Sequence, residues 1–247
     1  MRNLKLEIEY DGTDYCGWQI QRHRGHKRSI QETLQKTLSK ILQEKIRLIA
    51  SGRTDAGVPA SAQVANFKTN SKITPQKLLV ALNILLPGDI TITKVEEKRF
   101  DFHSRFDAKS KIYRYTILNR SYPSTFLRNT AYFYPHPLNI RLMRKETKVI
   151  LGRHNFKSFQ GSNTKQLDTV RTIKKIKINK NRDLIYIDIE GEGFLYNMVR
   201  NIVGTLIEIG RGKFPQGSLK RILHFKNRKF AGPTVPAKGL CLIKVKY

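Results

Sequence analysis

The apolar residues in the first hundred positions switch between a repeat of two and a repeat near 3.6, which limits the folds open to the chain. Four of them alternate with charged or polar residues and predict a half-buried strand: Leu4, Leu6, Ile8 and Tyr10. A helix is predicted to begin at Ser29, because Glu32 follows three residues later as in a capping box. A second helix opens at Thr74-Pro75. Further strands are predicted at 46–49, 63–67 and 90–95. The resulting order β, α, β, β, α, β is typical of ferredoxin-like folds.

The second half of the chain repeats this theme. A strand is predicted at 112–118, and Asn139 caps a helix that runs to about Leu151 and ends at Gly152. The remaining predicted elements are a hairpin of strands 170–178 and 184–189, helices at 194–209 and 218–225, and a closing strand at 240–245. The sequence therefore predicts an α+β protein of two α/β halves, 1–105 and 106–247.

The charge of the chain points to a polyanionic partner. Lys and Arg number 47 and Asp and Glu 19, so the formal net charge is +28. Nucleic acid is the expected partner of so basic a protein. An acidic membrane surface is disfavoured, because no basic amphipathic helix carries the charge and the longest apolar run is too short to span a bilayer. Cys16 and Cys241 lie far apart in sequence and do not have the spacing of a metal-binding pair. The simplest setting for a chain with these two cysteines is a reducing cytoplasm.

One carboxylate stands in an unusual place. Asp55 lies in the stretch SGRTDAGVPASAQVANF, after Arg53-Thr54 and before Gly57. Asp and Gly are ordinary turn formers, so a purely structural role is one interpretation. The other is a reactive carboxylate that Arg53 orients and that small, uncharged neighbours leave accessible. Acids are too scarce here to favour a metal-dependent nuclease, and a carboxylate without metal can act as nucleophile or general base.

Three other features each have a structural and a functional interpretation. Tyr113 and Tyr115 share one face of a strand, as core aromatics or as a platform for a displaced base. Arg200 falls just beyond the apolar arc of its predicted helix, where it either extends its head to solvent or pairs with Asp55. In the basic loop, Arg22, Arg24, Lys27 and Arg28 are candidate phosphate contacts.

Eight motifs in order along the chain resemble the TruA family of tRNA pseudouridine synthases. They are YDGTDYCGWQIQ (10–21), GRTDAGV (52–58), LNILLPGDI (82–90), FHSRFDA (102–108), KIYRYTI (111–117), GRHNF (152–156), GFLYNMVRNIVG (193–204) and PAKGLCL (236–242). Two positions depart from the family's usual pattern, since Pro59 replaces His and Asn155 stands where Asp is common. Pro59 also stiffens the loop that follows the turn.

The resemblance implies a pseudouridine synthase fold, with two ferredoxin-like or RRM-like halves around a central cleft, and a homodimer. It implies isomerisation of uridine in the anticodon arm of tRNA, at positions 38 to 40, with no metal and no cofactor. Asp55 would be the catalytic carboxylate and Arg53 would take the place of the displaced nucleotide. The remaining implied roles are stacking on the uracil by Tyr113, pairing with Asp55 by Arg200 and packing on the base by Leu240.

Two alternatives stay open at this level. A non-catalytic RNA-binding protein of two RRM-like halves fits the composition, although the aromatic RNP1 motif is missing. A glycosidase-type hydrolase usually needs two carboxylates beside the bond that it cleaves. Asp11 and Asp14 are the acids that could approach Asp55 in space.

Overall fold

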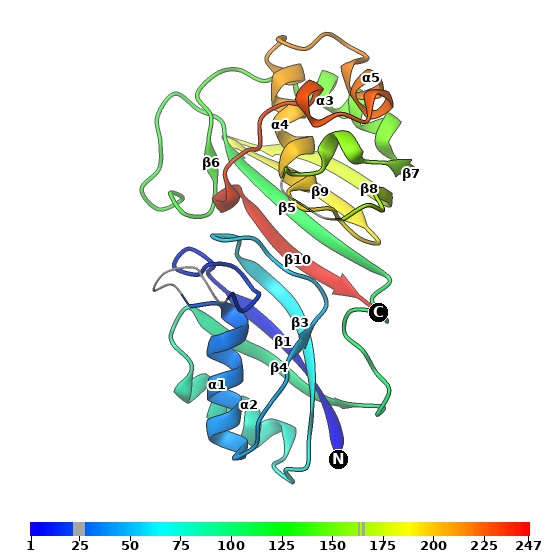
Figure 1. The fold of residues 1–247 in the computed structure, drawn as a ribbon. Helices are drawn as coiled ribbons and strands as arrows, with labels where there is room; N and C mark the ends of the chain where they lie inside the picture. Colours follow the sequence, from blue (N-terminus) through cyan, green and yellow to red (C-terminus); the bar gives the residue numbers. More distant parts are fainter. Residues whose placement is uncertain (22–27, 163, 165) are drawn as a thin grey trace. The chain divides into compact units, whose positions relative to one another are not determined.

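The computed structural model describes residues 1–21, 28–162, 164 and 166–247. Their internal contacts divide the chain into two units (Figure 1). Unit 1 consists of Met1–Lys109 together with Cys241–Tyr247, and unit 2 of Ser110–Leu240. The first unit thus contains a segment that follows the whole of the second in sequence. A functional division of the chain into 1–105 and 106–247 stays a prediction.

Unit 1 has the element order predicted for a ferredoxin-like fold. Its elements are β1 (Arg2–Tyr10), α1 (Ile30–Leu42), β2 (Ile49–Ala50), β3 (Ala60–Thr69), α2 (Pro75–Leu85) and β4 (Ile90–Lys98). The strands run in the order β4-β1-β3, β2 pairs with β3, and β10 (Leu240–Lys246) joins β3 in parallel. The α+β class predicted from the sequence is confirmed.

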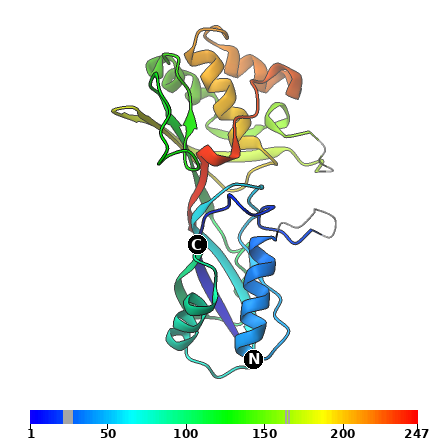
Figure 2. The same cartoon turned by 90° about the vertical axis from the view of Figure 1, so that its left-hand side faces the viewer.

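The two helices of unit 1 begin where the capping residues predict. The Ser29 hydroxyl accepts a hydrogen bond from the Glu32 amide, and the Thr74 hydroxyl accepts one from the Lys77 amide. The helices bury one apolar face each, made of Ile30, Leu34 and Leu38 in α1 and of Leu78 and Leu82 in α2. In Figure 1 both helices lie on one side of the strands, and Figure 2 shows them from that side.

The opposite side of β1 and β4 carries paired charges. Lys5 donates to Glu7 at 2.9 Å and to Glu96 at 3.2 Å. Glu96 also pairs with Lys94 at 2.7 Å and with Lys98 at 3.3 Å. The hydrogen bond from Lys94, together with those from the other two lysines, lowers the pKa of Glu96 to about 2. Three cations thus share one carboxylate on this face of the sheet.

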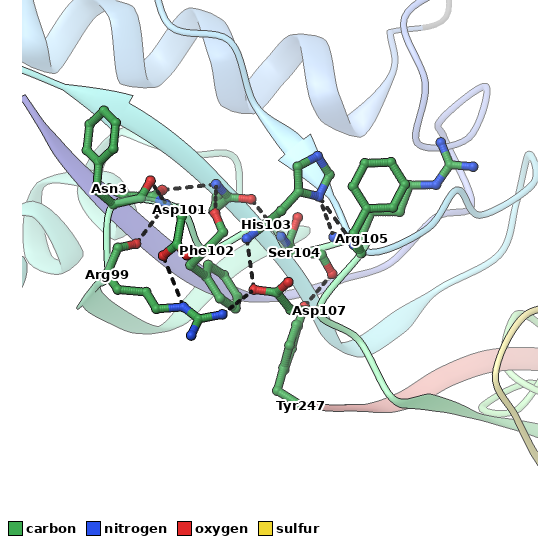
Figure 3. A network of polar contacts seen from close by, with 12 residues as sticks. Asn3, Arg99, Asp101, Phe102, His103, Ser104, Arg105, Asp107 and Tyr247 are labelled. Atoms are coloured by element: carbon green, nitrogen blue, oxygen red, sulfur yellow. Dashed lines mark hydrogen bonds and ion pairs between the residues drawn. The ribbon is translucent and has the colours of Figure 1, made fainter.

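The segment between β4 and β5 is tied to β1 and β3 through buried amides (Figure 3). Asn3 donates to the carbonyl of Phe102 at 2.8 Å, and Asn66 accepts from the amide of Ser104 at 2.9 Å. The Tyr247 hydroxyl donates to the carbonyl of Ser104 at 2.7 Å. These bonds satisfy polar groups that the segment buries, and they hold the end of β10 in unit 1.

Unit 2 is an antiparallel sheet with helices gathered over one face. Its strands follow the antiparallel order β5 (Ser110–Leu118), β9 (Leu184–Gly191), β8 (Val170–Asn181) and β7 (Gly152–Asn155), and the short β6 (Tyr132–Phe133) pairs with β5 in parallel. The helices are α3 (Ile140–Thr147), α4 (Met198–Gly210) and α5 (Ser218–Phe225), which contact one another (Figure 1). Asn139 caps α3 by accepting from Leu142, as predicted. The α-helix ends at Thr147, earlier than the predicted end near Leu151, and a 3-10 turn over Lys148–Ile150 leads to Gly152, whose φ is +88°.

Three other predicted boundaries are wrong. The helix expected at 194 begins at Met198, because Asn197 before it is left-handed with a φ of +57°. The strand expected at 46–49 is only Ile49–Ala50. The hairpin loop expected around 179–183 is reduced to a tight turn at Arg182, whose φ is +51°, since β8 continues to Asn181. In the part of the chain that the structure describes, no helix is long and apolar enough to cross a membrane.

The shared carboxylate on the charged face predicts a pH dependence of stability. The pKa of Glu96 falls from 4.5 to about 2 on folding, so its ionised form stabilises the folded state. That contribution is present at neutral pH and is lost as the pH falls from about 4.5 towards 2. We expect Glu96→Gln to lower the free energy of unfolding by up to about 1 kcal/mol at pH 7 and by much less at pH 2. Urea unfolding across this range measures the difference, and a constant difference would contradict the prediction.

Candidate active site

Asp55 lies on a tight turn between β2 and β3. The amide of Val58 donates to the carbonyl of Asp55 at 3.1 Å, and Gly57 between them has a φ of +74°, a conformation that favours glycine. Asp55 is half-buried and the neighbouring Arg53 is exposed. Thr54, between the two, is buried. The turn therefore holds Asp55 and Arg53 close together on a fixed backbone.

The segment after β1 clamps this turn through backbone contacts. The amide of Trp18 donates to the carbonyl of Thr54 at 3.1 Å. A Cβ at Gly17 would lie 2.7 Å from the Thr54 carbonyl oxygen, and one at Gly12 would lie 2.3 Å from the carbonyl oxygen of Val58. Both distances are shorter than atoms tolerate. Glycine at 12 and 17 is thus what lets the two segments approach.

Side chains beneath the turn complete the support. The hydroxyls of Tyr10 and Thr54 are hydrogen-bonded at 2.7 Å, and both residues are buried. Gln63 accepts from the Ser51 hydroxyl at 2.7 Å and donates to the carbonyl of Gly52 at 3.0 Å. Burial raises the pKa of Tyr10 far above its ordinary value, so this hydroxyl stays protonated. The neutral Tyr10 hydroxyl thus holds the turn through its hydrogen bond, and the negative charge of the turn comes from the Asp55 carboxylate.

The far end of the turn meets β10. The amide of Leu242 donates to the carbonyl of Pro59 at 3.2 Å, and Leu242 is opposite Ala60 in the parallel pairing. Proline keeps its carbonyl as an acceptor, so Pro59 serves at this position although it lacks an N–H. The strand that carries the turn is therefore fixed on both of its sides.

In unit 2, Tyr113 and Tyr115 lie on the same face of β5, as predicted. Tyr115 is completely buried, and its hydroxyl donates to the carbonyl of Pro236 at 2.8 Å. Gly239 lies directly on this ring, since a Cβ there would be 2.6 Å from it. Tyr113 is 8% exposed and packs edge-on against Phe194, with the ring centroids 5.2 Å apart. Tyr115 is thus a core residue that fixes the segment leading to Leu240.

Arg200 lies in the first turn of α4 and is anchored by two hydrogen bonds. Its Nε donates to the carbonyl of Val235 at 2.7 Å, and its Nη1 donates to Asn197 at 2.9 Å. The side chain is half-buried. Val235 and Pro236 belong to the segment that leads to Leu240, which is buried. Unit 2 therefore links Arg200 to the approach of Leu240 through one short stretch of backbone.

Of the basic loop, only one predicted residue lies among those that the structure describes. Arg22, Arg24 and Lys27 lie outside the described residues. Arg28 is exposed, and its carbonyl accepts from the amide of Cys16 at 3.1 Å. Arg28 is thus joined to the same segment that clamps the Asp55 turn.

The described residues offer no metal site, and unit 1 contains a cavity lined by cations. Among the described residues, no group of three or more His, Cys, Asp or Glu side chains could hold a metal ion. A cavity of about 340 Å3 in unit 1 is lined by four cations, Lys5, Lys98, Arg99 and Lys109, with Phe102, Asp107 and Tyr247. This cavity is not lined by any of the site residues that are both predicted from the sequence and described in the structure.

The sequence reasoning missed the residues that hold the turn. Tyr10 was read only as the last apolar residue of a strand, and Gly12 and Gly17 were not singled out. Their roles depend on contacts with residues more than 35 positions away, for which a single sequence carries no local signal. A glycine on each side of the Asp14-Tyr15 pair was the one available indication of a close backbone approach.

Comparisons with known proteins give one consistent result. A sequence model of the tRNA pseudouridine synthase family matches residues 7–107 and 147–247. The tRNA pseudouridine synthase A of Clostridium acetobutylicum is 49% identical over the full length of both chains. Those of Thermoanaerobacter sp. and Acetivibrio thermocellus are 46% and 44% identical, again over both full lengths. A solved Cbf5-Nop10-Gar1 complex contains a chain that is 10% identical, with a TM-score of 0.42 over 97% of this chain and 48% of that one. This last likeness is too weak to argue from.

Replacing Gly17 tests the clamp directly. We expect Gly17→Ala to destabilise the protein by about 2 kcal/mol or more, because alanine adds a clash with Thr54 to the strain of a φ of +100°. Gly212→Ala is the matched control, since its φ is +82° but nothing lies within 4 Å of the added Cβ. Denaturant unfolding of both variants separates the two effects. Equal losses of stability would mean that the clamp contact contributes nothing.

Proposed function

The chain belongs to the tRNA pseudouridine synthase family, and from this premise we propose that it isomerises uridine to pseudouridine in the anticodon arm of tRNA, at positions 38 to 40. The observation that carries the proposal is the Asp55 turn. A half-buried carboxylate stands beside an exposed arginine on backbone held from three directions, by Trp18, Gln63 and Leu242. Reactive groups need such support, because small displacements cost large factors in rate.

The reaction needs little beyond this carboxylate. The bond between N1 of uracil and C1′ of the sugar breaks, the base turns, and C5 bonds to C1′. The hydrogen of C5 leaves to solvent and N1 gains one, so no redox partner or phosphate donor takes part. Asp55 acts either as a nucleophile on the sugar or base, or as a base that removes a sugar proton. Both routes require Asp55 to be ionised.

The base must leave the helical stack before it can react. Arg53 is exposed and therefore able to enter RNA and occupy the position of the displaced nucleotide. Tyr113, held edge-on by Phe194, provides the ring on which uracil stacks, and Leu240 provides an apolar contact to the base. We assign phosphate contacts to Arg22, Arg24, Lys27 and Arg28, next to the clamp segment. The enzyme uses neither metal nor cofactor in this scheme.

Arg200 completes the site as the ionic partner of Asp55. Its anchors at Val235 and Asn197 fix the direction of the guanidinium, which favours one defined ion pair over a mobile surface cation. The cation favours the ionised form of Asp55 and so lowers the pKa of that carboxylate. We also propose that the protein works as a homodimer in the cytoplasm.

A binding protein of two RRM-like halves is the second candidate from composition. Membership of an enzyme family over the full chain disfavours it. The clamp does so too, because a protein that only binds RNA has no need to fix a carboxylate among the residues that face a polyanion.

The first experiment uses a tRNA transcript with tritium at uridine C5. Bond formation at C5 expels that hydrogen, so tritium released to water counts turnovers. We expect release by the wild type and a loss of at least about 1,000-fold with Asp55→Asn, while both bind tRNA with similar affinity. Tight binding by the wild type without release from any tRNA would sink the proposal and favour the binding protein.

Asp11→Asn and Asp14→Asn are the matched controls within unit 1. Asp11 accepts from the Thr13 amide and hydroxyl, and Asp14 is exposed. A synthase needs neither acid, so both variants should release tritium at the wild-type rate. A glycosidase would need a second carboxylate and would also release free uracil, which chromatography of the same samples detects.

The pH profile of turnover tests Arg200. Removal of the cation by Arg200→Gln should raise the pKa of Asp55, so activity is lost at higher pH than in the wild type. We expect the acid limb of the profile to move up by about one pH unit or more. Arg200→Lys keeps the charge and should leave the limb in place while lowering the rate. An unchanged limb with Arg200→Gln would remove Arg200 from this role.

A further inference from the structure

The loop between β5 and β6, residues 119–131, presents an aromatic ring almost completely to solvent. Phe126 is 96% exposed and Tyr122 in the same loop is 60% exposed. Figure 1 shows the loop projecting from the strands of unit 2. A single apolar residue on a surface needs no explanation, so the support and the surroundings of this ring decide whether it has a partner.

The loop is held by its own hydrogen bonds. The amides of Thr130 and Ala131 both donate to the carbonyl of Leu127, and the Leu127 amide donates to the Ser124 hydroxyl at 3.3 Å. At its base the Asn119 side chain donates to two carbonyls, those of Tyr134 and His136. Phe126 thus lies on a preformed turn, and a partner need not order it on binding.

The surroundings of the ring are basic. The stretch 119–131 contains Arg120 and Arg128 and no acidic residue. Arg120 stacks 4.1 Å from the centroid of Tyr122 and pairs with Asp183, and Arg128 is exposed two residues after Phe126. Asp183 belongs to the β8–β9 turn, in which Arg182 is exposed. Cations therefore outnumber acids around the loop.

We propose that this loop binds an unpaired base of the tRNA, stacked on the ring of Phe126, with Arg128 on a neighbouring phosphate. The inference rests on the proposed function. Stacking on an exposed aromatic beside a cation is the general way in which proteins hold unpaired bases. A second copy of the chain fits less well, because a stable protein interface needs a broad apolar centre and this loop offers only the rings of Phe126 and Tyr122 among polar and basic neighbours.

A tryptophan reporter tests the contact. Trp18 is the only tryptophan of the chain and is 1% exposed, so Phe126→Trp adds a single solvent-facing fluorophore. We expect unmodified tRNA to quench its emission and to protect it from acrylamide. Ile84→Trp, at a position in α2 that is 74% exposed, is the matched control and should not respond. No response at position 126 with saturating tRNA, or an equal response at position 84, would overturn the proposal.

Affinity measurements separate stacking from charge. We expect Phe126→Ala to weaken tRNA binding about tenfold without changing the dependence of the dissociation constant on salt. A plot of the logarithm of the dissociation constant against the logarithm of the salt concentration should have a slope that is lower by about 1 for Arg128→Gln. Wild-type affinity of Phe126→Ala would overturn the inference and leave the Asp55 experiment untouched. Loss of a dimer in sedimentation of Phe126→Ala would also overturn it, by assigning the ring to a protein contact.

Discussion

A backbone contact that only glycine permits fixes the turn that carries Asp55. Gly17 and Gly12 let the segment after β1 touch the Asp55 turn directly, and the Trp18 amide then binds the Thr54 carbonyl. Everything proposed for the reaction depends on that contact, since it decides where the carboxylate stands. A side chain at either position would push the turn away by more than the tolerance of a reacting group.

The second governing constraint is electrostatic. With 19 acids against 47 cations, the basic side chains outnumber the acidic ones by 28. Several of the acids serve the sheets, as Glu96 does among three lysines and Asp188 does in its paired hydrogen bonds to Arg114. Asp55 differs from these because it sits on a turn beside exposed Arg53, at a place suited to RNA. Glu96 and Asp188 thus act as structural ties in the sheets, whereas Asp55 is the acid to which we assign the reaction.

Elements with a local signal were predictable, and elements defined by distant contacts were not. Ser29, Thr74 and Asn139 act through amides three residues away, so their helices begin as expected. The start of α4 was misplaced, because apolar residues before Asn197 continue the helical period although the backbone does not. For the candidate site, the motif containing Asp55 and Arg53 could be identified in the sequence, and its catalytic role stays a prediction. The hydrogen bond between the Tyr10 and Thr54 hydroxyls could not be foreseen, since alternation marks Tyr10 only as buried.

The parallel pairing of β10 with β3 has a consequence for how the protein is made. Leu242 bonds to Pro59, next to the Asp55 turn, yet the ribosome must synthesise all of unit 2 between them. The sheet of unit 1 therefore stays one strand short throughout that interval, with the edge of β3 exposed. A contact so distant in sequence forms slowly, because the long intervening chain must lose conformational entropy before the contact can stabilise it. A chain interrupted within unit 2 thus carries every residue of the Asp55 turn without the strand that pairs beside it.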